Sequence, residues 1–237
     1  MKYDNICRGI FIERPNRFVA FVEINGKKEK AHVKNTGRCR ELLIPGAVVY
    51  LEDHISNMGS RKLRYSIITV EKTSGNEVIP VNIDSQAPNR VVREALENGK
   101  ILPDGLKDTE FIKGEYVYGA SRIDFYVRDS SGKEALLEVK GVTLEKNGDA
   151  MFPDAPTERG IKHINELVKA VGEGYTAAVI FIIQMKGVRL FTPNYGTHAA
   201  FGEALRVAER SGVGVLAYDC EVESDSILIG DPVSTKI

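Results

Sequence analysis

The chain has 237 residues, of which 43% are hydrophobic and 27% are charged, and its formal net charge at pH 7 is −1. This length suits one large domain or two modest ones, and the apolar content is sufficient for a packed core, which excludes a disordered chain. No apolar run reaches the roughly 20 residues that a membrane span needs, and the N-terminus carries no secretory pattern. We therefore expect a cytoplasmic protein with no membrane partner.

Residues 1–82 predict an all-β domain. Five segments in this part are candidate strands. Asn25 and Gly26 separate the second and third segments and form a strong two-residue hairpin signal, because both residue types tolerate positive φ. A short helical turn near residues 40–43 follows the third segment. Five strands with an insertion there predict a small OB-like β-barrel, a fold that often binds oligonucleotides. The expected strands are 9–13, 17–24, 29–34, 47–52 and 63–72.

This first part of the chain is basic, and the rest is acidic. Residues 1–80 carry 14 Lys and Arg against 9 Asp and Glu, whereas the remaining residues carry 18 against 24. A basic docking domain joined to an acidic domain suits an enzyme that acts on nucleic acid. Alternating lysines also protect the edge of a sheet from pairing, which is the simpler explanation. The candidate DNA or phosphate contacts in this domain are Lys34, Asn35, Arg38, Arg40, Arg61 and Lys62.

Residues 83–237 alternate helices with strands. We expect helices over 88–98, ended by Gly99, over 157–171, with Thr157 as N-cap, and over 199–210. The continuous apolar run 177–184 is typical of a central strand buried on both faces. The other expected strands are 116–118, one around Asp124, one around Glu138, and 213–218. This order predicts an α+β or α/β domain in which helices flank a mixed sheet.

Two neighbouring strands of this domain carry charged side chains where apolar ones are usual. The segments 122–127 and 136–142 are joined by a turn-like stretch, so they can form a hairpin. Strand alternation places Glu138 and Lys140 on one face, and the hairpin can bring Asp124 beside them. Two carboxylates can hold Mg²⁺ or Mn²⁺, and the lysine can orient a water or stabilise the transition state of phosphodiester hydrolysis. An ordinary polar strand face is the alternative.

The helix that follows this hairpin adds further polar groups. Arg159 and His163 are four residues apart and therefore lie on one side of the helix. Arg159 is close to the helix N-terminus, where the dipole and the free N–H groups already favour an anion. We count Arg159, His163 and Arg122 among the candidate phosphate contacts. A solvated helix face with one ion pair, Glu158 with Lys162, is the alternative.

The cysteines and histidines indicate no zinc site and no disulfide framework. The three cysteines, Cys7, Cys39 and Cys220, are odd in number and lack Cys-x-x-Cys spacing, and no two histidines have His-x-x-x-His spacing. A reduced protein is the simplest inference, with any metal held mainly by oxygen. We expect Mg²⁺ or Mn²⁺ and no organic cofactor.

Across essentially its full length the sequence resembles the sugar fermentation stimulation protein A family. The segments that carry the resemblance are His32–Arg38, Ser121–Phe125, Glu138–Lys140 and Phe152–Gly160, the last followed by His163. The resemblance implies an N-terminal OB-like domain, residues 1–82. It also implies a C-terminal domain, residues 83–237, like the PD-(D/E)xK restriction endonucleases.

The same resemblance implies roles for individual residues. Asp124 and Glu138 would be metal ligands, Lys140 the catalytic lysine, and Glu94 a further candidate acid on the preceding helix. Ile123 replaces the proline of the motif's name. The family is associated with non-specific DNA binding and with a proposed regulatory role in sugar metabolism.

Two functions are consistent with these features. The first is a nuclease dependent on Mg²⁺ or Mn²⁺ that hydrolyses phosphodiester bonds in DNA. The second is a non-catalytic DNA-binding regulator of sugar metabolism genes that retains the nuclease fold. Either should bind without sequence preference, because the chain shows no helix-turn-helix. Lys140 favours the nuclease, since pure binding has little use for a lysine two residues from a ligand. The sequence leaves open whether the nucleic acid is single- or double-stranded, whether it is DNA or RNA, and whether the protein forms a homo-oligomer.

Overall fold

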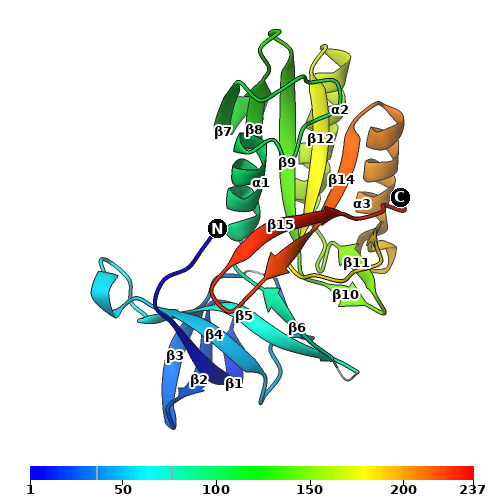
Figure 1. The fold of residues 1–237 in the computed structure, drawn as a ribbon. Helices are drawn as coiled ribbons and strands as arrows, with labels where there is room; N and C mark the ends of the chain where they lie inside the picture. Colours follow the sequence, from blue (N-terminus) through cyan, green and yellow to red (C-terminus); the bar gives the residue numbers. More distant parts are fainter. Residues whose placement is uncertain (36, 76) are drawn as a thin grey trace.

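The structure, a computed structural model, describes residues 1–35, 37–75 and 77–237. A β-barrel formed by the N-terminal part lies against one end of a larger domain with a central sheet and helices (Figure 1). Thr36, in one of the segments that carry the family resemblance, lies outside the described residues.

The N-terminal domain is a closed five-stranded barrel, as the sequence predicts. Antiparallel pairing runs in the order β3-β2-β1-β4-β5, and a parallel pairing of β3 with β5 closes the barrel. Closure leaves no unpaired sheet edge among these five strands. A sixth strand that we did not predict, β6, continues from β5 towards the second domain. The strands are β1 (Ile6–Asn16), β2 (Val19–Ile24), β3 (Lys27–Val33), β4 (Val48–Asp53), β5 (Tyr65–Ser74) and β6 (Glu77–Asn82).

Two local predictions in the barrel are confirmed. Asn25 and Gly26 join β2 to β3 with φ of 50° and 75°, the left-handed values that a tight hairpin requires. Between β3 and β4, the amide of Leu43 donates to the carbonyl of Cys39 over 2.9 Å, which makes one helical turn. A short 3-10 helix, η1 (Ile55–Asn57), connects β4 to β5.

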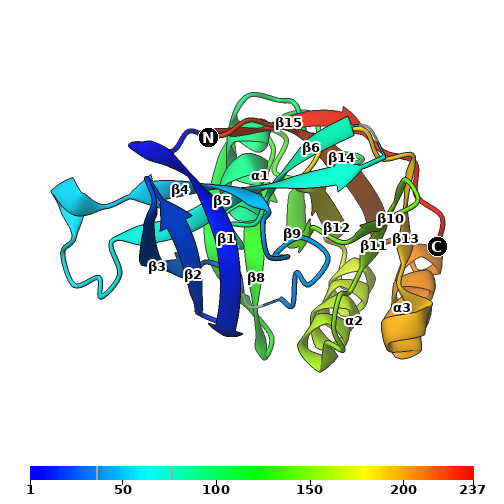
Figure 2. The ribbon, with the colours of Figure 1, turned by 90° about the horizontal axis from the view of Figure 1, so that it is seen from below.

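The C-terminal domain contains a mixed six-stranded sheet in the order β15-β14-β12-β9-β8-β7. Its centre is parallel, because β12 pairs in parallel with both β9 and β14. Helix α1 packs on one face, and α2 and α3 lie side by side on the other (Figures 1 and 2). The strands are β7 (Phe111–Tyr118), β8 (Ser121–Arg128), β9 (Glu134–Val142), β12 (Thr176–Ile183), β14 (Gly214–Val222) and β15 (Ile227–Pro232).

The three helices lie close to their predicted positions. Helix α1 (Ala87–Glu97) ends before Gly99, whose φ is 66°. Helix α2 (Glu158–Gly172) begins at Thr157, whose side chain accepts a 3.0 Å hydrogen bond from the amide of Gly160. Helix α3 (Tyr195–Arg210) has non-helical dihedral angles at His198, just before the predicted start. Local capping signals therefore fixed these helix ends.

A small second sheet, absent from our sequence prediction, lies beside the main one. It consists of β10 (Glu145–Lys146), β11 (Asp149–Phe152) and β13 (Leu190–Pro193). These strands are too short to produce a clear periodic pattern. Within the described part of the chain, no helix is long and apolar enough to cross a membrane.

Candidate active site

Strands β8 and β9 separate at the point where the two candidate acids lie. The hairpin predicted for them is present, and its antiparallel ladder ends with Phe125 opposite Leu137. Beyond that pair the two strands no longer pair with each other. Strand β8 continues to pair with β7, and β9 continues to pair with β12. The next pair in the same register is Asp124 and Glu138. The two acids therefore face each other across the opening between two strands.

Both oxygens of Asp124 are held by hydrogen bonds. Its Oδ2 accepts from the backbone amide of Val139 over 2.8 Å, and its Oδ1 accepts from Nδ2 of Asn89 on α1 over 2.9 Å. Burial, and then the negative charge of Glu138, raise the pKa of Asp124 above its ordinary value. Two like charges in a poorly hydrated site repel, and a bound cation would relieve that repulsion.

Glu138 is 2% exposed and is the centre of a buried polar cluster. Its Oε1 accepts from Nζ of Lys140 over 2.5 Å and also contacts Nδ1 of His163. Burial acts to raise the pKa of Glu138. The hydrogen bond from His163 and the charge of Lys140 outweigh burial, so the pKa lies below its ordinary value. The carboxylate is therefore ionised and available as a ligand.

Helix α2 contributes His163 and Arg159 to this cluster. Nε of Arg159 lies 3.4 Å from Nε2 of His163. If Nε2 accepts that proton, Nδ1 carries the ring proton and donates to Glu138. The sequence placed both residues among the phosphate contacts. In the structure His163 contacts Glu138 and Arg159 lies exposed beside His163, so their contacts with phosphate stay predictions.

The residues present fit a hard divalent cation. Oε2 of Glu138 is buried and has no hydrogen-bond partner, although it belongs to an ionised group. A buried carboxylate oxygen without a partner is costly unless a proton donor or a cation reaches it. In the described part of the chain, no three His, Cys, Asp or Glu side chains are close enough together to hold a metal. Two carboxylates completed by water and substrate oxygens are, however, a usual Mg²⁺ environment.

The structure places Glu94 away from this cluster. Its carboxylate accepts a 2.7 Å hydrogen bond from the N-terminal ammonium group of Met1. Asn89, one and a half turns earlier on α1, is the residue of that helix that contacts Asp124. Glu94, the further acid that the sequence suggested, thus forms an ion pair with the ammonium group of Met1 and does not contact Asp124 or Glu138.

Lys34 is committed to an internal ion pair. Its Nζ lies 2.9 Å from Oδ2 of Asp84 and 3.6 Å from Glu52, and its side chain is 15% exposed. Asp84 is itself 1% exposed. Lys34 therefore links the barrel to the segment before α1 and has little surface to offer DNA.

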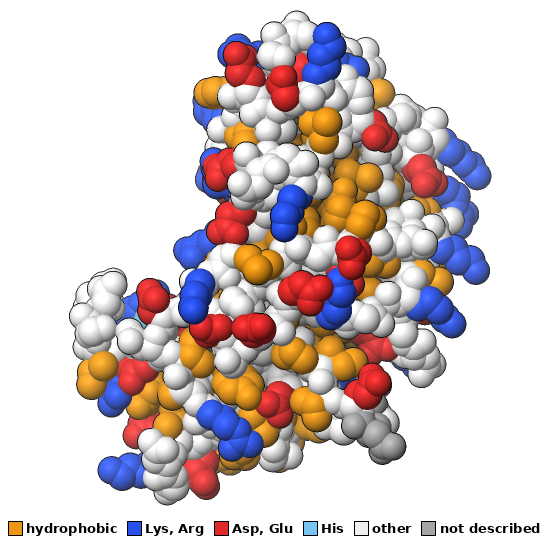
Figure 3. All heavy atoms as spheres, in the orientation of Figure 1, with side chains coloured by type: hydrophobic (Ala, Val, Ile, Leu, Met, Phe, Trp, Pro, Cys, Tyr) orange, Lys and Arg blue, Asp and Glu red, His pale blue; other side chains and the backbone are white. Residues whose placement is uncertain are grey.

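Of the remaining predicted contacts, Arg38 and Arg40 line one pocket of the barrel, whereas Arg122, Arg61 and Lys62 lie elsewhere. Arg122 forms a 3.0 Å ion pair with Glu115. Arg61 and Lys62 border a small pocket with His32. On the face seen in Figure 3, basic and acidic side chains are interspersed and form no continuous basic patch.

Two of the segments that carry the family resemblance meet between the domains. The amide of Arg38, after β3, donates to Oδ2 of Asp154, which lies before α2, over 3.0 Å. A Cβ on Gly37 would lie 2.5 Å from the same oxygen, so this close approach requires glycine. The side chain of Asn35 accepts from the amide of Gly37 over 2.7 Å. The barrel loop is thereby held against the domain that carries Asp124 and Glu138.

Sequence reasoning missed three residues of α1 beside Asp124. Asn89, Arg90 and Arg93 line a pocket of about 190 Å³ together with Asp124. Asn89 and Arg93 are four residues apart, so the sequence alone predicts that they share one side of a helix. Without knowledge of which face of α1 meets the sheet, that spacing could not be assigned to the site.

Comparisons with known proteins match both domains. Residues 12–81 match the SfsA N-terminal OB domain, and residues 86–226 match the sugar fermentation stimulation protein RE domain. A sugar fermentation stimulation protein homolog of Desulfitobacterium hafniense is 54% identical over 100% of this chain and 99% of its own. A homolog of Ruminiclostridium cellulolyticum is 51% identical over 100% of both chains.

The whole chain also aligns with a solved structure. The SfsA of Pyrococcus furiosus in complex with Ca²⁺ aligns with a TM-score of 0.86 and 29% sequence identity. The alignment covers 100% of this chain and 98% of the other. The two-domain architecture is thus shared along the full length.

Proposed function

The chain belongs to the sugar fermentation stimulation protein family, and from this premise we propose that it is a DNA-binding protein that hydrolyses phosphodiester bonds with a divalent metal ion. One observation supports this above all others. Glu138 lies opposite Asp124 where β8 and β9 separate, it is buried and ionised, and its second oxygen has no partner.

Asp124 and Glu138 would hold the metal. Mg²⁺ or Mn²⁺ in this position would acidify a bound water and neutralise charge that develops on the phosphate. The hydrogen bonds from Val139 and Asn89 keep the Asp124 carboxylate in one orientation before any metal binds. The Ca²⁺ complex of the Pyrococcus furiosus relative supports a site for a hard cation in proteins of this fold.

Lys140 would act on the attacking water or on the developing oxyanion. Its ammonium group lies 2.5 Å from Glu138, so it is already inside the site. Positive charge fixed at the reacting phosphate stabilises the transition state more than the ground state. His163 and Arg159 would act behind Glu138, keeping its carboxylate oriented and ionised.

A DNA degradation assay tests this function. Purified protein should degrade single-stranded or duplex DNA with Mg²⁺ or Mn²⁺, and the activity should disappear with EDTA and in Asp124→Asn. Intact DNA under all metal conditions, with a preparation shown to be folded, would overturn the enzymatic part.

The second candidate function is DNA binding without cleavage, as in a regulator of sugar metabolism genes. Arg17, Arg38 and Arg40 of the barrel domain line a pocket outside the metal cluster, and among the described residues no carboxylate lies within 4.0 Å of their side chains, which favours this candidate. Salt-dependent binding of DNA that is never cleaved would identify it.

A further inference from the structure

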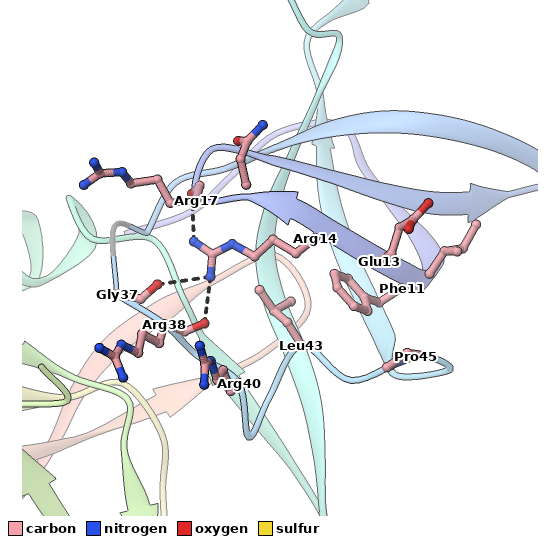
Figure 4. Close-up of a pocket in the computed structure, with 11 residues that line it drawn as sticks. Phe11, Glu13, Arg14, Arg17, Gly37, Arg38, Arg40, Leu43 and Pro45 are labelled. Carbon is pink, nitrogen blue, oxygen red and sulfur yellow. Dashed lines mark hydrogen bonds between the residues drawn. The ribbon is translucent and has the colours of Figure 1, made fainter.

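One pocket of the barrel domain is lined by four arginines. It has a volume of about 470 Å³, and it is formed by the end of β1, the β1–β2 turn and the loop after β3 (Figure 4). Sites for small ligands typically have volumes of about 300–1,000 Å³. The arginines are Arg14, Arg17, Arg38 and Arg40.

Arg14 builds the wall of this pocket. Its guanidinium group donates to four backbone carbonyls, those of Arg17, Asn35, Gly37 and Arg38, over 2.7–3.0 Å. Figure 4 shows Arg14 between the β1–β2 turn and the loop after β3. Burial lowers the pKa of Arg14. Arg14 therefore links the β1–β2 turn to the loop after β3 by hydrogen bonds to their backbones.

The other three arginines are free to bind a ligand. Within the described part of the chain, the side chains of Arg17, Arg38 and Arg40 have no carboxylate within 4.0 Å, and Arg14 holds Arg17 and Arg38 only through their backbone carbonyls. Glu13 also lines the pocket, but its carboxylate is paired with Lys28 over 3.0 Å. The three guanidinium groups, which have no acidic partner among the described residues, repel one another and attract an anion. Phosphate matches the fork of guanidinium donors.

The same pocket has an apolar part. Phe11 and Pro45, with Glu13 near them, lie on the side away from Arg17 and Arg38, and Leu43 lies between the two sides (Figure 4). Next to Arg17 in the β1–β2 turn, Phe18 is 50% exposed, and the guanidinium group of Arg17 lies 5.3 Å from its ring. Exposed aromatic rings and arginine planes are the surfaces on which unpaired bases stack.

We propose that this pocket binds one nucleotide of a single-stranded DNA segment, with its phosphate on Arg17, Arg38 and Arg40 and its base on the apolar side. The proposal rests on the DNA-binding part of the proposed function and specifies its substrate. A duplex hides the faces of its bases, so it could use the arginines and not the apolar side. A single strand can use both.

The pocket is also tied to the domain of the candidate active site. Arg38 offers its side chain to the pocket, while its amide is bonded to Asp154 before α2. A strand held in the barrel would thus be anchored by a loop that the second domain itself holds in place.

Fluorescence anisotropy in EDTA tests this proposal without any need for cleavage. The probes are a labelled 15-nucleotide poly-dT strand, a 15-base-pair duplex, and the same strand with abasic positions. The variant is R17Q/R38Q, which keeps every backbone hydrogen bond to Arg14. The charge-matched control is K107Q/R210Q, which removes two positive charges from the second domain.

We expect R17Q/R38Q to weaken single-strand binding by about tenfold and to reduce the salt slope by about 0.7, since both arginines contact the same phosphate and one phosphate contact on a single strand accounts for about 0.7. The control should change neither. Duplex binding should fall by less than about threefold, and abasic strands should bind the unaltered protein more weakly than poly-dT.

Two results would overturn the nucleotide pocket. One is an equal loss of single-strand and duplex affinity in R17Q/R38Q, which would indicate general electrostatic attraction. The other is unchanged single-strand binding. If the unaltered protein binds neither probe, the DNA-binding part of the proposed function fails instead, so the two failures are distinguishable.

Discussion

The carboxylate of Asp124 occupies the position of a strand partner for Val139. Where β8 leaves β9, the amide of Val139 donates over 2.8 Å to Oδ2 of Asp124. Val139 is the residue between Glu138 and Lys140, so one hydrogen bond fixes the first acid relative to the other two charged groups. The separation of β8 from β9 therefore also brings the side chains of the cluster together.

Metal binding should stabilise the folded protein. At a Mg²⁺, Mn²⁺ or Ca²⁺ concentration ten times the dissociation constant, linkage gives about 1.4 kcal/mol, which corresponds to a rise in Tm of about 3–6 °C. Asp124→Asn and Glu138→Gln should lose this rise because each removes a ligand charge. Differential scanning fluorimetry measures it.

Glu94→Gln is the control for that experiment. Because Glu94 contacts the N-terminal ammonium group and not the cluster, this variant should respond to metal as the unaltered protein does. A lost response in Glu94→Gln alone would contradict the ligand set proposed above.

Replacing Lys140 should separate binding from cleavage. We expect Lys140→Ala to reduce the rate of DNA cleavage by about 10²–10³, as expected when one transition-state contact is removed. DNA affinity should change by less than about twofold, since the lysine is one of many charges. Lys169→Ala, on the solvent side of α2, is the control, and gel-based cleavage rates with anisotropy provide both readouts.

Asn89 should act as a positioning residue for Asp124. Loss of its side chain in Asn89→Ala removes the 2.9 Å hydrogen bond to Oδ1, and a change of this kind behind a metal ligand costs about 10–100-fold in metal affinity or activity. Isothermal titration with Mn²⁺ measures the affinity. Asn98→Ala at the other end of α1 is the matched control, and equal effects of the two variants would contradict this role.

Lys34 should matter for stability more than for DNA. In Lys34→Met the carboxylate of Asp84, which is 1% exposed, loses its ion-pair partner, and breaking a buried pair costs about 3–5 kcal/mol. We expect a clear fall in the urea midpoint, with DNA affinity unchanged within about twofold. A variant that is fully stable but binds DNA weakly would contradict the structural role.

The turn between β8 and β9 should give a defined pH dependence of stability. Burial disfavours the charge of Asp129, but hydrogen bonds from Ser131, Lys107 and Lys133 outweigh it and lower its pKa to about 2. A lowered pKa in the folded state stabilises the protein above about pH 4, and that stabilisation disappears as the pH falls towards 2.

Asp129→Asn should therefore lower Tm at pH 7, and the difference from the unaltered protein should shrink between about pH 4 and 2. Thermal unfolding followed by circular dichroism at several pH values measures this difference. A Tm difference that stays constant down to pH 2 would mean that the charge of Asp129 has no part in it.

Local signals in the sequence determined much of the fold. Asn25 with Gly26 fixed a hairpin, Thr157 and Gly99 fixed helix ends, and strand alternation placed Glu138 and Lys140 on one face. Each of these depends on a few consecutive residues, whose dihedral preferences and side-chain directions are set by their own chemistry. Strand β6 escaped prediction because Pro80 lies inside it, and a proline within a run argues against a strand. The strands of the small second sheet escaped it because they have only two to four residues, and β15 was not predicted either.

Only the tertiary structure decided which polar groups meet. His163 contacts Glu138, Asn89 and not Glu94 contacts Asp124, and Lys34 turns inward to Asp84. These partners lie between 25 and 50 residues apart in the chain. The periodicity of a helix or strand predicts which side chains share a face. It does not predict which other element packs against that face. That choice follows from how the helices pack on the sheet and how the barrel docks against it, and these depend on the whole core at once.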